Sequence, residues 1–190
     1  MSASNGRSMM FPLLRRNRQP DTISSLYGTI VAQARSPVFY REFGVADTIG
    51  GRFDLLLLHL AFVVERLMRE EEGKAFGQDL FDRFCTDMDD NLREMGIGDL
   101  AVPKHMKRVG EAFYGRAQAY KTALQSAGDA ALVEALSRNV YSGSPADPAA
   151  VARLATYIRR VAQAIDRTAS AELLSGCIVL PDPADVPTQV

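Results

Sequence analysis

The chain has 190 residues, of which 47% are hydrophobic and 24% charged, and its formal net charge at pH 7 is −1. These values are typical of one soluble globular domain. They argue against direct nucleic-acid binding, which usually requires a basic excess. The two cysteines, Cys85 and Cys177, lie far apart and form no CxxC pair. A disulfide framework or a zinc site is therefore not expected.

Residues 1–20 are predicted to form a flexible basic leader, because they contain four arginines and no acidic residue. In the stretch MMFPLLRRNR, apolar side chains stand beside basic ones. This combination suits contact with an anionic lipid surface, and a disordered leader without that role is the alternative. The candidate membrane-contact residues are Phe11, Leu13, Leu14, Arg15 and Arg16.

Residues 21–176 are predicted to form a single compact all-α domain of six to eight helices, because apolar residues recur at spacings of three and four. The helix expected at about 53–72 is apolar almost all round and is therefore predicted to be central and buried, with Gly73 ending it. Its longest apolar run, LLLLHLAFVV, would span about 15 Å, roughly half of a bilayer core.

Two long helices are expected next, at about 75–95 and about 103–126, separated by a break at GIG. The first has one apolar face, and acidic residues spread over the other face. The second contains Gly110 and Gly115, each of which costs about 1 kcal/mol relative to alanine inside a helix. We expect the close approach of a neighbouring helix to compensate for this cost.

A short helix at about 130–138 and a loop, NVYSGSPADP, precede the last long helix, which is predicted to start at Asp147 and Pro148. Residues 177–190 contain a proline-rich stretch and are predicted to form an extended tail. The sequence has no strand-type alternation, no internal repeat and no sign of a second core.

No catalytic, cofactor-binding or metal-binding constellation is predicted. DMDDNL begins like a calcium loop, but Leu92 stands where that loop requires glycine. GIGDLA matches a dinucleotide-binding fingerprint, but a charged helix precedes it instead of a strand. His59 lies in an apolar helix and is interpreted as a core histidine that is hydrogen-bonded to a neighbour.

The alternative is a magnesium-dependent all-α enzyme acting on an isoprenoid diphosphate. Asp89, Asp90 and Glu94 resemble the acidic helical motifs that hold magnesium and diphosphate in isoprenoid synthases. Those enzymes need two acidic motifs that face each other, and only one is visible. A solvated acidic surface is therefore the favoured interpretation of these residues.

Three stretches in order, FGVADTIGGRFDLLLLHLAFVVERL, LFDRFCTDMDDNLREMGIGDLAVPKHMKR and EAFYGRAQAY, resemble the ubiquinol–cytochrome c chaperone family. The resemblance covers about residues 37–124. It implies a non-enzymatic assembly factor without a cofactor, which binds newly made cytochrome b and promotes assembly of the cytochrome bc1 complex. Mitochondrial members act with a small partner protein near the ribosome, so a small co-chaperone and the ribosome are further candidate partners.

No long transit peptide is evident, so we expect a bacterial member that works in the cytoplasm, peripherally associated with the inner membrane. A eukaryotic member would occupy the mitochondrial matrix. Cytoplasmic loops of membrane proteins are rich in Lys and Arg, and the acidic side of the helix at about 75–95 is predicted to receive such loops. The candidate client- and partner-binding residues are Asp82, Asp87, Asp89, Asp90, Arg93, Glu94, Asp99, Lys104, Arg116 and Tyr120.

Three of these candidates have structural alternatives. Asp99 would be a local acceptor for backbone N–H groups. Arg116 and Tyr120 lie one turn apart and would pack against the preceding long helix.

Overall fold

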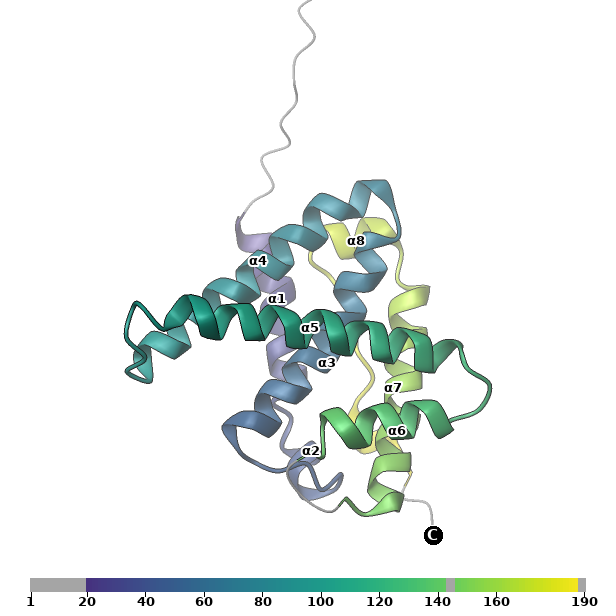
Figure 1. The fold of residues 1–190 in the computed structure, drawn as a ribbon. Helices are drawn as coiled ribbons and strands as arrows, with labels where there is room; N and C mark the ends of the chain where they lie inside the picture. The colour runs from purple at the N-terminus through teal and green to yellow at the C-terminus, as the bar shows by residue number, and fades with distance from the viewer. Residues whose placement is uncertain (1–19, 143–145, 188–190) are drawn as a thin grey trace, which may run out of the picture.

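Helices make up all the regular structure in the part of the chain that the computed structural model describes, residues 20–142 and 146–187 (Figure 1). The predicted all-α fold class is confirmed. The helices are α1 (Pro20–Ala34), α2 (Pro37–Arg41), α3 (Ile49–Met68), α4 (Glu71–Glu94), α5 (Val102–Gln125), α6 (Ala130–Asn139), α7 (Pro148–Arg167), α8 (Ser170–Leu174) and the 3-10 helix η1 (Pro183–Asp185).

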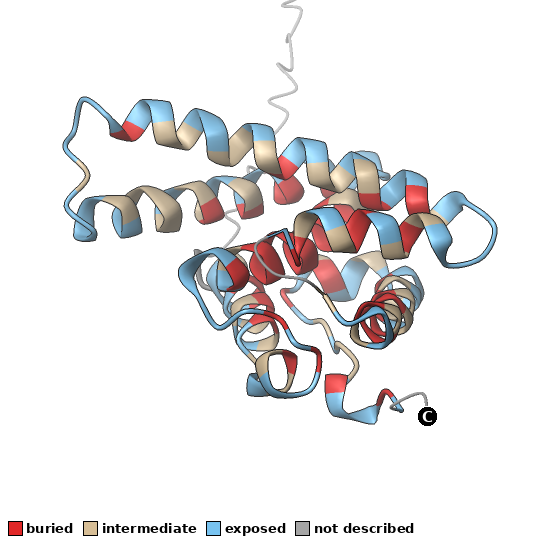
Figure 2. Ribbon diagram, turned by 60° about the horizontal axis from the view of Figure 1, so that its bottom comes forward, coloured by how far each residue is buried: buried red, intermediate tan, exposed pale blue. Residues whose placement is uncertain are grey.

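Helix α3 lies at the centre of the molecule and packs against α1, α4, α5 and α7. Every residue from Asp54 to Val64 is buried. A helix that is apolar on all sides needs neighbours on all sides to remove it from water, and these four helices supply them. Figure 2 shows the buried residues concentrated at the centre of the molecule, with helices on either side. The predicted central helix is therefore confirmed.

The two ends of α3 depend on glycines at points of close approach. At its start, the Thr48 hydroxyl accepts a hydrogen bond of 3.2 Å from the backbone N–H of Gly51. A Cβ atom on Gly51 would overlap the carbonyl oxygen of Ala46. The prediction that Gly73 ends α3 is wrong, because Gly73 lies in the first turns of α4. Its missing side chain lets α4 pass close to the carbonyl oxygen of Leu67.

Helices α4 and α5 form a hairpin whose connection, residues 95–101, projects beyond the rest of the molecule (Figure 2). Nearer the body, the rings of Phe81 and Phe113 hold the two helices together, with centroids 4.7 Å apart. No atom would lie within 4 Å of a Cβ on Gly110 or Gly115, beyond the helix's own neighbouring backbone. The expected close approach of a neighbouring helix at these glycines is therefore wrong.

The chain that follows α8 packs back onto the core beside α7. Arg153 of α7 is buried, and its Nε donates a hydrogen bond of 2.9 Å to the carbonyl oxygen of Val186. The same guanidinium binds Glu42 at 3.0 Å and lies 4.4 Å from the centre of the Phe43 ring. Val186 is itself buried. These contacts fix Val186, the residue that follows η1, against α7, and they join α7 to the end of α2.

His59 of α3 is fully buried and satisfied by hydrogen bonds. Its Nδ1 lies 2.7 Å from the carbonyl oxygen of Leu55, and its Nε2 lies 2.9 Å from the hydroxyl of Tyr157. The Tyr157 oxygen in turn accepts a hydrogen bond of 2.7 Å from Gln33. The interpretation of His59 as a hydrogen-bonded core histidine is therefore confirmed.

Candidate functional site

The acidic residues of α4 divide into engaged and available groups. Asp87 is half-buried and accepts a hydrogen bond of 2.8 Å from the hydroxyl of Tyr27 on α1. Asp89 binds Nε of Arg93 at 2.6 Å, one turn along the helix. The guanidinium of Arg93 also binds the carboxylate of Asp99 in the connection to α5. These contacts bring Asp89, Arg93 and Asp99 together, and the two carboxylates share the one positive charge of Arg93.

Among the predicted residues, the available acids are Asp82, Asp90 and Glu94, which are exposed on α4. Asp82 accepts a hydrogen bond of 2.8 Å from Gln78, another exposed side chain. Within the described ranges, none of the three carboxylates is within ion-pair distance of a basic group. We call these three residues the acidic face.

The other predicted residues lie elsewhere. Lys104 is exposed in the first turn of α5. Arg116 binds Asp54 of α3 at 2.5 Å, and burial raises the pKa of that carboxyl group while Arg116 opposes the shift. Tyr120 is buried, and its ring lies 6.1 Å from that of Phe62 on α3.

Two of the structural alternatives are therefore wrong. Arg116 and Tyr120 contact Asp54 and Phe62 of α3, whereas the alternative places them against the preceding long helix α4. Asp99 accepts from the Arg93 side chain, not from the backbone. The predicted membrane-contact residues Phe11, Leu13, Leu14, Arg15 and Arg16 lie outside the described residues.

An apolar groove with a volume of about 490 Å³ lies beside the acidic face, between the end of α1, the start of α3 and the outer parts of α4 and α5. Ile49 and Met95 line it and are 71% and 58% exposed, so apolar surface there faces solvent. We call this cavity the apolar groove. Its lining includes Val31, Ile49, Phe53, Leu56, Met88, Asn91, Leu92, Met95 and Val109, with Arg35 and Arg52 as basic members.

Sequence reasoning missed the apolar groove. Met88 and Met95 stand on the apolar face of α4, which looked like an ordinary core face. The sequence pattern places the start of this helix at about residue 53, whereas Ile49 already belongs to α3. The one available signal was this isoleucine, an apolar residue in a stretch otherwise composed of small and polar residues.

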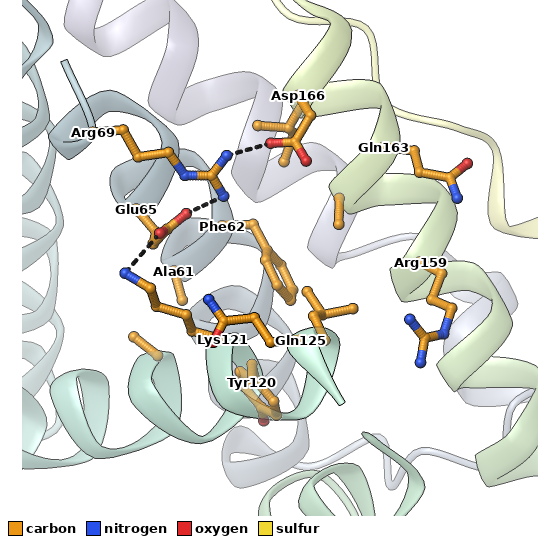
Figure 3. A pocket seen from close by; sticks show the side chains of 14 residues that line it. Ala61, Phe62, Glu65, Arg69, Tyr120, Lys121, Gln125, Arg159, Gln163 and Asp166 are labelled. Carbon is orange, nitrogen blue, oxygen red and sulfur yellow. Dashed lines mark hydrogen bonds and ion pairs between the residues drawn. The ribbon is translucent and has the colours of Figure 1, made fainter. Parts of the chain in front are cut away.

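A second cavity, of about 570 Å³, lies between α3, α5 and α7 (Figure 3). Arg69 crosses its mouth and binds Glu65 at 2.5 Å and Asp166 of α7 at 2.7 Å. Lys121 of α5 binds the other side of Glu65 at 3.1 Å. Burial alone would raise the pKa of Glu65, but hydrogen bonds from Arg69 and Lys121 outweigh it and lower that pKa. Both acids in this cavity are therefore engaged by bases that tie three helices together.

Neither cavity offers a metal-binding arrangement. In residues 20–142 and 146–187, no three His, Cys, Asp or Glu side chains are grouped so that they could hold a metal ion. Among the same residues, no helix has the length and apolar character needed to cross a membrane. The features that stand out are therefore surfaces, namely the acidic face and the apolar groove beside it.

Comparison with known proteins identifies the family. A model of the ubiquinol–cytochrome C chaperone family matches residues 41–180. The chain belongs to this family. The crystal structure of the Cbp3 homolog from Brucella abortus superposes with a TM-score of 0.82 at 35% sequence identity, over 90% of this chain and 95% of the other. A comparison with curated proteins gave no match.

The match to the ubiquinol–cytochrome C chaperone family extends beyond the stretches that carried the sequence resemblance. It continues to residue 180 and so includes α6, α7 and α8. Most of the apolar groove and all of the second cavity lie inside the matched region. Only the α1 side of the groove, at Val31, Ala34 and Arg35, precedes it.

Proposed function

We propose that this chain is an assembly chaperone for the cytochrome bc1 complex and that its client is newly made cytochrome b. The observation that carries the proposal is the family match over residues 41–180, supported by the likeness to a Cbp3 homolog along almost the whole chain. The role is that of a binding protein, without catalysis and without a cofactor. The acidic face and the apolar groove are the surfaces that suit such a role.

The acidic face would capture the client first. Loops of membrane proteins on the cytoplasmic side are rich in Lys and Arg. Asp90 and Glu94 lie one turn apart and are exposed, so they would attract such loops and speed encounter in a salt-dependent manner. Reversal of one such exposed charge would lower client recovery roughly fivefold.

The apolar groove would then hold an apolar part of the client. Met95 lines the groove and directly follows Glu94 of the acidic face, so one client segment could touch both surfaces. Burial of apolar side chains gives affinity that salt does not screen. A loop with basic residues next to an apolar segment matches this arrangement, and such junctions are common at the cytoplasmic ends of transmembrane helices.

We place this activity at the cytoplasmic surface of a bacterial inner membrane, or in the mitochondrial matrix for a eukaryotic chain. The client is a membrane protein, which favours peripheral contact with the bilayer. The basic leader, through Phe11, Leu13, Leu14, Arg15 and Arg16, is one candidate for that contact. A small co-chaperone and the ribosome are further candidate partners.

The test uses a host that lacks the endogenous gene and carries tagged full-length variants. We expect Asp90→Lys and Ile49→Asp each to reduce the cytochrome b that co-purifies and the amount of assembled bc1 complex. The matched controls are Glu134→Lys on α6 and Val179→Asp after α8, which make the same changes at other exposed positions. A host without the gene that keeps a normal bc1 level would refute the proposal, and equal losses in variants and controls would refute the assignment of the surfaces.

A further inference from the structure

The connection between α4 and α5 projects from the body of the molecule (Figure 2). It carries exposed apolar side chains. Leu100 is 100% exposed and Met95 is 58% exposed. A single exposed leucine is common on protein surfaces. Here two exposed apolar side chains share one projecting connection of seven residues, 95–101. They form a tip that could insert into an apolar environment without disturbing the core.

Basic residues follow this tip on the outer side of α5. Lys104, Lys107 and Arg108 are all exposed, and their spacing places them on one face of the helix. The opposite face of α5 packs against the protein, and its residues Val102 and Phe113 are buried. We call Lys104, Lys107 and Arg108 the tip cations.

Most acidic groups near the tip belong to α4, whereas the tip cations belong to α5. Asp89 and Asp99 share the one positive charge of Arg93, so this cluster keeps one net negative charge against the three tip cations. Glu111 is 3.8 Å from Lys107, which is a weak pair between two exposed side chains. The remaining exposed acids, Asp90 and Glu94, belong to α4, the other helix of the hairpin.

We propose that the hairpin tip docks on the surface of an anionic lipid bilayer, with Leu100 and Met95 in the headgroup–acyl boundary and the tip cations on the headgroups. Apolar anchors next to basic residues are the combination that binds peripheral proteins to anionic membranes. The inference rests on the membrane contact in the proposed function and assigns it to residues 95–108. Met95 also lines the apolar groove, so docking brings that groove to the bilayer surface, where a membrane-protein client is made.

The chain contains no tryptophan, which allows a direct optical test. In the full-length Leu100→Trp variant, we expect the emission to shift to the blue with phosphatidylcholine vesicles that contain phosphatidylglycerol, and brominated acyl chains to quench it. Vesicles of phosphatidylcholine alone should give neither effect. The control is Val179→Trp, which replaces an apolar side chain that is 86% exposed in the segment after α8, and its emission should not change.

Charge substitutions test the second part of the site. Each cation near an anionic surface strengthens binding about fivefold, so replacing all three tip cations by glutamine should lower the vesicle partition coefficient about 100-fold. A control with the same change in net charge replaces three exposed cations on α4, α6 and α7, and it should retain most of the binding. The control substitutions are Lys74→Gln, Arg138→Gln and Arg167→Gln.

Three results would overturn the inference. The first is an unshifted Leu100→Trp spectrum while the protein still sediments with vesicles, which would place the membrane contact elsewhere, for example in the leader. The second is an equal loss of binding in both triple variants. The third is a tip that ignores lipid but crosslinks to cytochrome b, which would assign it to the client. The vesicle assays contain no cytochrome b, so their failure leaves the proposed chaperone role to be judged separately by bc1 assembly in the host.

Discussion

Protonation of His59 is expected to destabilise the fold as the pH falls below neutral. Burial lowers the pKa of His59 from 6.5 to about 4, and the hydrogen bond to the carbonyl of Leu55 opposes the shift. In the arrangement that satisfies every atom, Nδ1–H donates to Leu55 and Nε2 accepts from the Tyr157 hydroxyl. A second proton would place a charge at a fully buried position and remove the acceptor that Tyr157 uses.

The sign and size follow from the two pKa values. Between pH 6.5 and about 4 the unfolded chain binds a proton at this residue and the folded chain does not, so stability falls as the pH falls. Well above pH 6.5 the histidine is neutral in both states, so its protonation costs the folded state no stability. About 2 kcal/mol is lost by about pH 5 and about 3 kcal/mol by about pH 4. This is a large share of the 5–15 kcal/mol that typically stabilises a domain.

The assay compares urea unfolding of the wild type and His59→Gln between about pH 7.5 and 5. The glutamine variant is expected to be less stable at neutral pH, but its loss of stability toward pH 5 should be about 2 kcal/mol smaller. Other titrating groups act equally in both proteins and cancel in the difference. Equal pH dependence in the two proteins would refute the reasoning. So would an NMR titration in which His59, one of only two histidines, titrates at its ordinary value.

Two further predictions concern single positions, and urea unfolding measures both. Arg116→Met should cost about 3 kcal/mol because it leaves the buried carboxylate of Asp54 unpaired, and adding Asp54→Asn should recover part of the loss. Full stability of the single variant would contradict a structural pair. Gly110→Ala should raise stability by up to about 1 kcal/mol, because its Cβ would meet open space, whereas Gly51→Ala should lower it because its Cβ would overlap Ala46. A loss at Gly110 would indicate a neighbour that packs there.

Local signals made much of the fold predictable from the sequence. Helix α3 was identified because apolar residues on every side leave a helix no exposed face. The start of α7 was identified because Asp147 and Pro148 form a helix start, and the Asp147 carboxylate does accept a hydrogen bond of 3.0 Å from the N–H of Ala149. In both cases the deciding signal comes from residues that are close in the sequence.

Long-range partners were not predictable in this way. Arg116 pairs with Asp54, 62 positions away, and Asp87 accepts from Tyr27, 60 positions away. Periodicity identifies the face of a helix that is buried, but it does not identify the helix that covers that face. The same limit hid the apolar groove, because an apolar face that is only partly covered has the same sequence pattern as one that is fully covered.

The α4–α5 hairpin is buried at its base and exposed at its end, which explains why its end would be the part that binds client and membrane. In α4 the last buried residue is Phe84, and in α5 the buried residues after Val102 resume at Phe113. The segment between Phe84 and Phe113 therefore contributes little to the core, yet it carries Asp90 and Glu94 of the acidic face, one wall of the apolar groove and the tip cations. Substitutions there alter charge and apolar surface while the packing around α3 stays intact. Variants in this segment thus report on binding, whereas variants of His59 or Asp54 report on folding.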